Sequence, residues 1–144
     1  SDASDDELLI PLREAIDGAT LAKGSSKQTK LTRAVLGNEA GIIGAALLPL
    51  VAYNYSRLLG RERRYEECIE VAEIGRRCCV MYGRCKMLGG LLLNIAYSLH
   101  ELGDDEKAKE LLIESYYAYK VMEDFRSCEV VQKYAEESLK KLIP

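Results

Sequence analysis

The chain has 144 residues, of which 48% are hydrophobic and 30% are charged, and its formal net charge is -3. This length suits one domain with a proper core, and the composition excludes a disordered or fibrous chain. A pI of about 5.3 argues against non-specific nucleic-acid binding by the domain. Because the chain has only three prolines and one Phe, we expect helices rather than a β-sandwich.

The N-terminus is acidic and lacks the basic segment of a signal peptide. The longest apolar run, Ala40 to Ala52, has thirteen residues, fewer than the roughly 20 that a bilayer-spanning helix needs. We therefore expect a soluble, cytoplasmic protein that has no membrane partner.

The five cysteines do not form a zinc-binding pattern, because none pairs as CxxC and the chain has a single histidine, His100. Free cysteine packs as a small hydrophobic side chain, so we expect buried, reduced thiols. The cysteines are Cys68, Cys78, Cys79, Cys85 and Cys128.

In chain order, the apolar spacing predicts a first helix over Glu7–Ala22, which begins near Leu8 because Pro11 is tolerated only in a first helical turn. The composition of Lys23–Lys30 predicts a loop. The segment Leu31–Leu36 is compatible with a short strand or with a turn of helix. The expected N-terminal unit is therefore a helix-loop-helix segment.

The second helix of this segment is predicted over Gly37–Leu48, with Asn38 as its N-cap. Gly37, Gly41 and Ala45 fall four residues apart on one face, which permits close approach of another backbone. Pro49 removes the helical hydrogen bond to Ala45, so we expect it to interrupt or kink the helix, and we place the break at Leu47–Pro49.

Two segments read as helical hairpins, Leu50–Tyr82 and Leu91–Asp124. In the second, Gly103 provides a left-handed helix end, Asp104 is an N-cap, and Ala108 allows close helix packing. An offset of forty residues aligns small and large positions of the two hairpins, and it aligns Asn54 with Asn94. The aligned pairs are Ala52 and Leu92, Tyr55 and Ile95, Ser56 and Ala96, Leu59 and Leu99, Cys68 and Ala108, and Gly75 and Ser115.

Repeated helical hairpins are typical of a solenoid, in which neighbours bury each other's apolar stripes. A last amphipathic helix over Phe125–Leu142 is expected to cap it. The apolar stripe of that helix comprises Val130, Val131, Tyr134, Ala135, Ser138, Leu139 and Leu142.

These hairpins resemble tetratricopeptide repeats, above all the longer-helix type in Rgg/PlcR-like peptide-sensing bacterial regulators. The matching strings are LLPLVAYNYSRLLGRERRYEECIEVAEIG, YGR and LLLNIAYSLHELGDDEKAKELLIESYYAYKVMED. The residues that carry the consensus are Tyr65, Glu67, Cys68, Gly103 and Ala108. The chain departs from it at Arg63, where the first turn usually has glycine, and at Asp105, where the second usually has an aromatic residue.

The N-terminal part of the chain resembles a different family. The string DELLIPLREAIDGATLAKGSSKQTKLTRAVLGNEAGIIGAALL is similar to the C-terminal tail of ROK sugar kinases. The two resemblances meet at Leu47–Leu50, which suggests a fusion or a convergence on a helix of small residues. Kinase activity is not expected, because Gly37, Gly41 and Gly44 make no phosphate loop and the family's catalytic groups are absent.

When helical hairpins stack, the first helix of each hairpin lines a concave groove. The residues of that helix that lie outside its apolar stripe face the groove. The resemblance implies that Asn54 and Asn94 hold the main chain of a bound peptide, and amide side chains can donate and accept hydrogen bonds. Tyr53, Tyr97 and Arg57 are the further candidates, with Glu101 near the rim. The alternative is that these residues are solvated or belong to the core.

We therefore expect an all-α protein with a ROK-tail-like segment at 1–48 and a tetratricopeptide-like repeat domain at 49–144. Its expected function is to bind a peptide or protein segment, as the sensor part of a bacterial transcriptional regulator. We expect no catalytic residue, cofactor or metal, and no nucleic-acid binding by this chain itself. The alternatives are a fragment or partner of a ROK-type kinase or repressor, and a structural domain that forms a homodimer.

Overall fold

The computed structural model describes residues 39–82, 86–141 and 143–144, and this part of the chain is almost entirely helical, without a strand. The predicted all-α fold class is thus confirmed for these residues. The predicted helix at 7–22, the loop at 23–30 and the segment at 31–36 lie outside the described residues. The helices are α3 (Glu39–Arg61), α4 (Tyr65–Tyr82), α5 (Leu88–Glu101), α6 (Asp105–Val121) and α7 (Phe125–Leu139).

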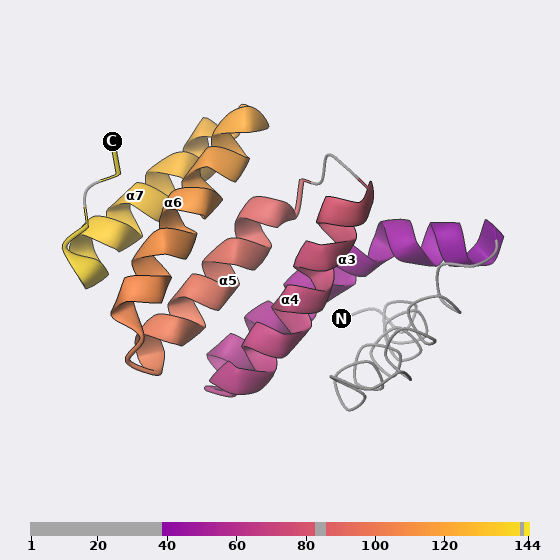
Figure 1. Cartoon of the computed structure of the whole chain (residues 1–144), viewed down its shortest axis with the longest axis horizontal. Helices are drawn as coiled ribbons and strands as arrows, with labels where there is room; N and C mark the ends of the chain where they lie inside the picture. The colour runs from indigo at the N-terminus through magenta and orange to yellow at the C-terminus, as the bar shows by residue number, and fades with distance from the viewer. Residues whose placement is uncertain (1–38, 83–85, 142) are drawn as a thin grey trace.

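Each of these helices packs against the next one along the chain, and α3 also packs against α5. Figure 1 shows α4 in front of the later part of α3, and α6 in front of α7, with α5 between the two pairs. The helix ends repeat along the chain, because α3 ends at Arg61 and α5 ends forty residues later at Glu101. Likewise, α4 begins at Tyr65 and α6 begins forty residues later at Asp105.

The break expected at Leu47–Pro49 is wrong, because α3 continues through Pro49 as one helix. Figure 1 shows that α3 instead changes direction along its length, as expected where a proline disrupts the bonding of a helix. A proline in a helix interior costs about 3 kcal/mol. Leu48, Val51 and Ala52 flank Pro49 and are all buried, and this packing offsets the cost.

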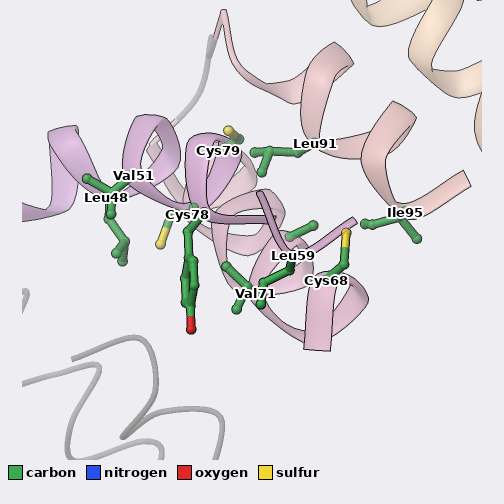
Figure 2. Close-up of a cluster of buried hydrophobic side chains, with 12 residues drawn as sticks. Leu48, Val51, Leu59, Cys68, Val71, Cys78, Cys79, Leu91 and Ile95 are labelled. Carbon is green, nitrogen blue, oxygen red and sulfur yellow. The ribbon is translucent and has the colours of Figure 1, made fainter. Parts of the chain in front are cut away.

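The core consists of two clusters that share α5. The first joins α3, α4 and α5, and Figure 2 shows Leu59, Cys68 and Ile95 from these three helices pointing toward one another. The second joins α5, α6 and α7 through residues that include Ala108 and Val131. Since partly buried leucines at positions 99 and 111 pack against both clusters, the core is continuous along the described helices.

The buried face of α7 differs from the predicted stripe. Val130 is 55% exposed and Ser138 is also exposed, whereas Cys128 is buried. The helix ends at Leu139, where Lys140 adopts a left-handed conformation as its C-cap, rather than at position 142. The observed stripe is narrower because only residues three or four positions apart share the helix face that packs against α6. The buried residues of α7 are Cys128, Val131, Ala135 and Leu139.

Three helix connections have the same backbone turn. A residue with positive φ follows each helix: Arg63 at 60°, Gly103 at 90° and Glu123 at 58°. The next amide then donates to a carbonyl five residues earlier, as in Asp104 N to Leu99 O at 2.9 Å. This pattern closes the helix end with a left-handed residue, so the prediction for Gly103 is confirmed.

Aspartates begin the two helices that follow Gly103 and Glu123. The Asp104 carboxylate accepts a hydrogen bond from the Lys107 amide, which confirms the predicted N-cap of α6. The Asp124 carboxylate accepts from both the amide and the hydroxyl of Ser127, and these bonds lower its pKa. Such caps satisfy amide groups that the first turn of a helix leaves without partners.

Replacing Glu123 by glycine is expected to raise the free energy of unfolding by about 0.5 kcal/mol, because glycine adopts positive φ without steric cost. Gly103→Ala is expected to lower it by about 1 kcal/mol for the same reason. Urea unfolding followed by circular dichroism measures both changes. Glu136→Gly, at an exposed position inside α7, is the control and should destabilise. Equal losses for Glu123→Gly and Glu136→Gly contradict the prediction.

Gly75 lets α4 lie close to both α3 and α5. A Cβ atom on Gly75 would stand 2.7 Å from the Cβ of Ala52 on α3 and 2.9 Å from a methyl group of Leu91 on α5. Ala52 and Leu91 are themselves fully buried. Since the Ala52 contact involves a rigid methyl group next to the backbone, a side chain at Gly75 would force the helices apart.

Gly75→Ala is therefore expected to lower the free energy of unfolding by about 1–3 kcal/mol, the usual cost of overpacking a core. The matched control is Gly60→Ala in α3, where the nearest atom to the added Cβ lies at an ordinary 3.7 Å. This control should leave stability unchanged or raise it by up to about 1 kcal/mol, since alanine favours helix. A Gly75→Ala variant as stable as the control would show that α4 has room to move.

Candidate binding surfaces

The two matched asparagines do not occupy equivalent surroundings. The Asn94 side-chain amide on α5 donates to the Tyr53 carbonyl at 3.3 Å and to the Ser56 hydroxyl at 2.9 Å, both on α3. Ser56 is fully buried and donates in turn to the Tyr53 carbonyl. Asn54, by contrast, is exposed. The two amides thus differ in their surroundings, and peptide contacts by Asn54 and Asn94 stay predictions.

The sequence offset does not show this difference, because it does not show which helices pack against each position. Asn54 on α3 faces solvent, whereas the matching Asn94 on α5 faces α3, because α3 and α5 pack against each other. Asn94 is half-buried, and the two hydrogen bonds that its amide nitrogen donates stabilise the contact between α5 and α3.

Tyr53 is half-buried, and its ring lies over the start of α5. A Cβ atom on Gly90 would stand 2.4 Å from the Tyr53 ring, and one on Gly89 would stand 2.8 Å from the Tyr119 ring. The paired glycines thus admit two aromatic rings from α3 and α6. Burial raises the pKa of Tyr119 to about 12. The Tyr53 ring therefore packs against the start of α5, and ligand contact by Tyr53 stays a prediction.

Tyr97 is 36% exposed and lies in a row of aromatic side chains. Its ring centroid is 6.1 Å from that of Tyr65 on α4 and 6.1 Å from that of Tyr134 on α7. Arg57 is exposed on α3. Ligand contacts by Tyr97 and Arg57 remain predictions, but the row around Tyr97 was not expected from the sequence.

A groove of about 540 Å³ lies where α4, α5 and α6 meet, and the sequence analysis missed it. Its floor includes Leu88 and Leu92 at the start of α5. Its edges carry apolar side chains that are largely exposed, with Val80 of α4 at 71% and Val121 of α6 at 63%. The sequence signal for this groove was a valine outside the buried stripe near the C-terminal end of each of α4 and α6.

Polar groups lie at both edges of this groove. Arg76 of α4 is paired with Glu73 at 3.1 Å, and Glu114 is exposed on α6. Tyr117, 43% exposed, packs edge-on against Tyr116 with ring centroids 5.3 Å apart. The Lys120 ammonium group lies 5.7 Å from the Tyr117 ring centroid. The α6 edge is therefore stabilised by the contact between Tyr116 and Tyr117 and by the cation–π contact of Lys120.

The thiols match the expected reduced state only in part. Cys68, Cys78 and Cys128 are free and buried, whereas Cys79 is disulfide-bonded. Burial raises the pKa of Cys68 and of Cys78, which keeps these thiols protonated at neutral pH. Disulfide pairing depends on proximity in the fold, which cysteine spacing alone does not give. Cys85 lies outside the described residues.

Among the described residues, no three acidic, histidine or cysteine side chains gather closely enough to hold a metal ion. His100 instead places Nδ1 2.7 Å from a carboxylate oxygen of Asp105. Within the same residues, no helix has the length and apolar character that crossing a membrane requires.

Comparisons with protein-family models, with curated proteins and with solved structures find no match for this chain. The resemblances to tetratricopeptide repeats and to ROK tails therefore stay predictions, and the described residues define an all-helical protein. The groove and the aromatic row are the two candidate binding surfaces of the described residues.

Asn94→Ala is expected to lower the free energy of unfolding by about 1–2 kcal/mol, because it removes two hydrogen bonds between α5 and α3. Asn54→Ala is the matched control and should stay within about 0.5 kcal/mol of the parent chain, since Asn54 is exposed. Urea unfolding measures both. If the two variants are equally stable, Asn94 does not tie the helices together.

Proposed function

We propose that this chain is a helical-repeat module that binds a linear peptide or protein segment in the groove between α4 and α6. The observation that carries the proposal is the groove itself, with an apolar floor and largely exposed valines at positions 80 and 121 on its edges. Exposed apolar side chains around a concavity are typical of interaction sites, because covering them releases water.

The size and shape of the groove favour a segment of chain over a small molecule that is fully enclosed. Its volume of about 540 Å³ lies within the range of ligand sites. It runs between two helices rather than into the core, so apolar side chains can enter while their backbone stays in solvent. Arg76 and Glu114, on opposite edges, can then fix the direction of the segment through polar contacts.

The repeat architecture is part of the same proposal. Support comes from the forty-residue offset between helix ends and from the equal turns at Arg63 and Gly103. In this proposal the described helices are a tetratricopeptide-like solenoid, and α7 is its cap. The role as sensor part of a transcriptional regulator rests on the family resemblance alone, and binding rather than catalysis is the activity proposed.

Display selection with random linear peptides tests the groove. Peptides selected on the parent chain should bind the double variant Val80→Asp, Val121→Asp at least about tenfold more weakly, because two carboxylates would enter an apolar site. Both valines are largely exposed, so the variant should fold, and circular dichroism verifies this.

Val130→Asp is the matched control, because Val130 is 55% exposed on α7 and does not line the groove. Peptides that bind the double variant as tightly as the parent chain contradict the proposal. A library that yields no peptide specific to the parent chain contradicts it as well.

A further inference from the structure

Three tyrosine rings and one carboxylate from three helices form a second surface, here called the tyrosine face: Tyr65, Tyr97, Glu101 and Tyr134. Tyr97 is its centre, with Tyr65 at an interplanar angle of 69° on one side and Tyr134 at 52° on the other. Tyr97 also lies close to Gly60 at the end of α3. Contacts with α3, α4 and α7 thus fix its ring before any ligand arrives.

A carboxylate lies next to these rings. Glu101 follows Tyr97 by one helical turn and is exposed, and its carboxylate accepts a hydrogen bond from the Tyr65 hydroxyl at 3.3 Å. Among the described residues no cation pairs with Glu101. Desolvation and then the Glu101 charge raise the pKa of Tyr65, and they raise that of Tyr134 to about 12.

A second carboxylate, that of Asp105, lies near Tyr134. The His100 ring is 6.4 Å from the Tyr134 ring, edge to face, and its Nδ1 atom contacts Asp105 at 2.7 Å. The three tyrosine rings therefore lie near two carboxylates, those of Glu101 and Asp105. Electron-rich ring faces beside carboxylates attract organic cations and repel anions.

We propose that the tyrosine face binds a basic side chain of a partner protein, with an arginine guanidinium over the Tyr97 ring and paired with Glu101. Guanidinium suits this site because it is planar, stacks on aromatic rings and donates two parallel hydrogen bonds to a carboxylate. The Tyr65 hydroxyl holds Glu101 in position while leaving acceptor capacity on the carboxylate.

This site is separate from the groove proposed above, because neither Tyr97 nor Glu101 lines that groove. Each proposal can therefore fail without the other. A groove variant should leave the tyrosine face intact, and a variant of the tyrosine face should leave peptide binding in the groove intact.

Titration of the full chain with Nα-acetyl-arginine amide, followed by amide NMR shifts, tests the proposal. We expect saturable shifts centred on Tyr97 and Glu101, and none with the uncharged citrulline analogue at matched sodium chloride. Glu101→Gln should weaken binding at least about fivefold, and Tyr97→Leu about threefold, since one removes the ion pair and the other the ring. The matched controls are Glu110→Gln on α6 and Phe125→Leu on α7, both at exposed positions outside the groove and the tyrosine face, which should bind like the parent chain.

The proposal is overturned by equal shifts with the citrulline analogue, by parent-like binding of Glu101→Gln, or by no saturation up to roughly 50 mM. Glu101→Gln is a conservative change at an exposed position, so loss of folding does not confuse the result. The Glu110→Gln control can also weaken binding as much as Glu101→Gln does. In that case the arginine probe is attracted to acidic side chains in general, and the proposal also fails.

Discussion

The close approach of α4 to α3 and α5 at Gly75 sets the geometry of the rest of the structure. The missing side chain lets Ala52 and Leu91 contact the α4 backbone from two sides. The first hairpin is thereby held against α5 at short range, and Cys68, Leu59 and Ile95 close the core farther along. Interiors packed at this density do not absorb an extra methyl group by small adjustments.

Other features follow from this approach. Because α3 and α5 lie side by side, the Asn94 amide reaches the Tyr53 carbonyl and the Ser56 hydroxyl. The N-terminal part of α5 carries Gly89 and Gly90, against which the rings of Tyr119 from α6 and Tyr53 from α3 pack. Between these contacts, α5 forms the floor of the groove that α4 and α6 border. The groove is thus a consequence of how the two hairpins are spaced.

Local chemistry in the sequence predicted the helical elements well. Gly103 and Asp104 were predicted because a left-handed helix end and an N-cap depend on a few neighbouring residues. The prediction failed where several helices act together. Pro49 lies inside α3 because buried neighbours hold that helix together, and the Asn94 amide bonds to α3 because α5 packs against that helix.

The candidate surfaces were harder to predict because exposure on a helix depends on its neighbours. Tyr97 was singled out, but the row that it forms with Tyr65 and Tyr134 needs residues from three helices. Val80 and Val121 lie far apart in sequence and border one groove only once α4 and α6 are placed over α5. Periodicity shows which side chains share a helix face, not what lies opposite that face.

The two proposed surfaces use opposite sides of α5. Leu92 belongs to the groove floor and Tyr97 to the tyrosine face, five residues apart on the same helix. Five residues advance about 7.5 Å along a helix and turn about 140° around it. A short ligand in the groove therefore cannot reach Tyr97, and a partner that uses both surfaces must pass around α5. Since α5 packs against α3, α4 and α6, such a partner would meet the two surfaces at a fixed separation.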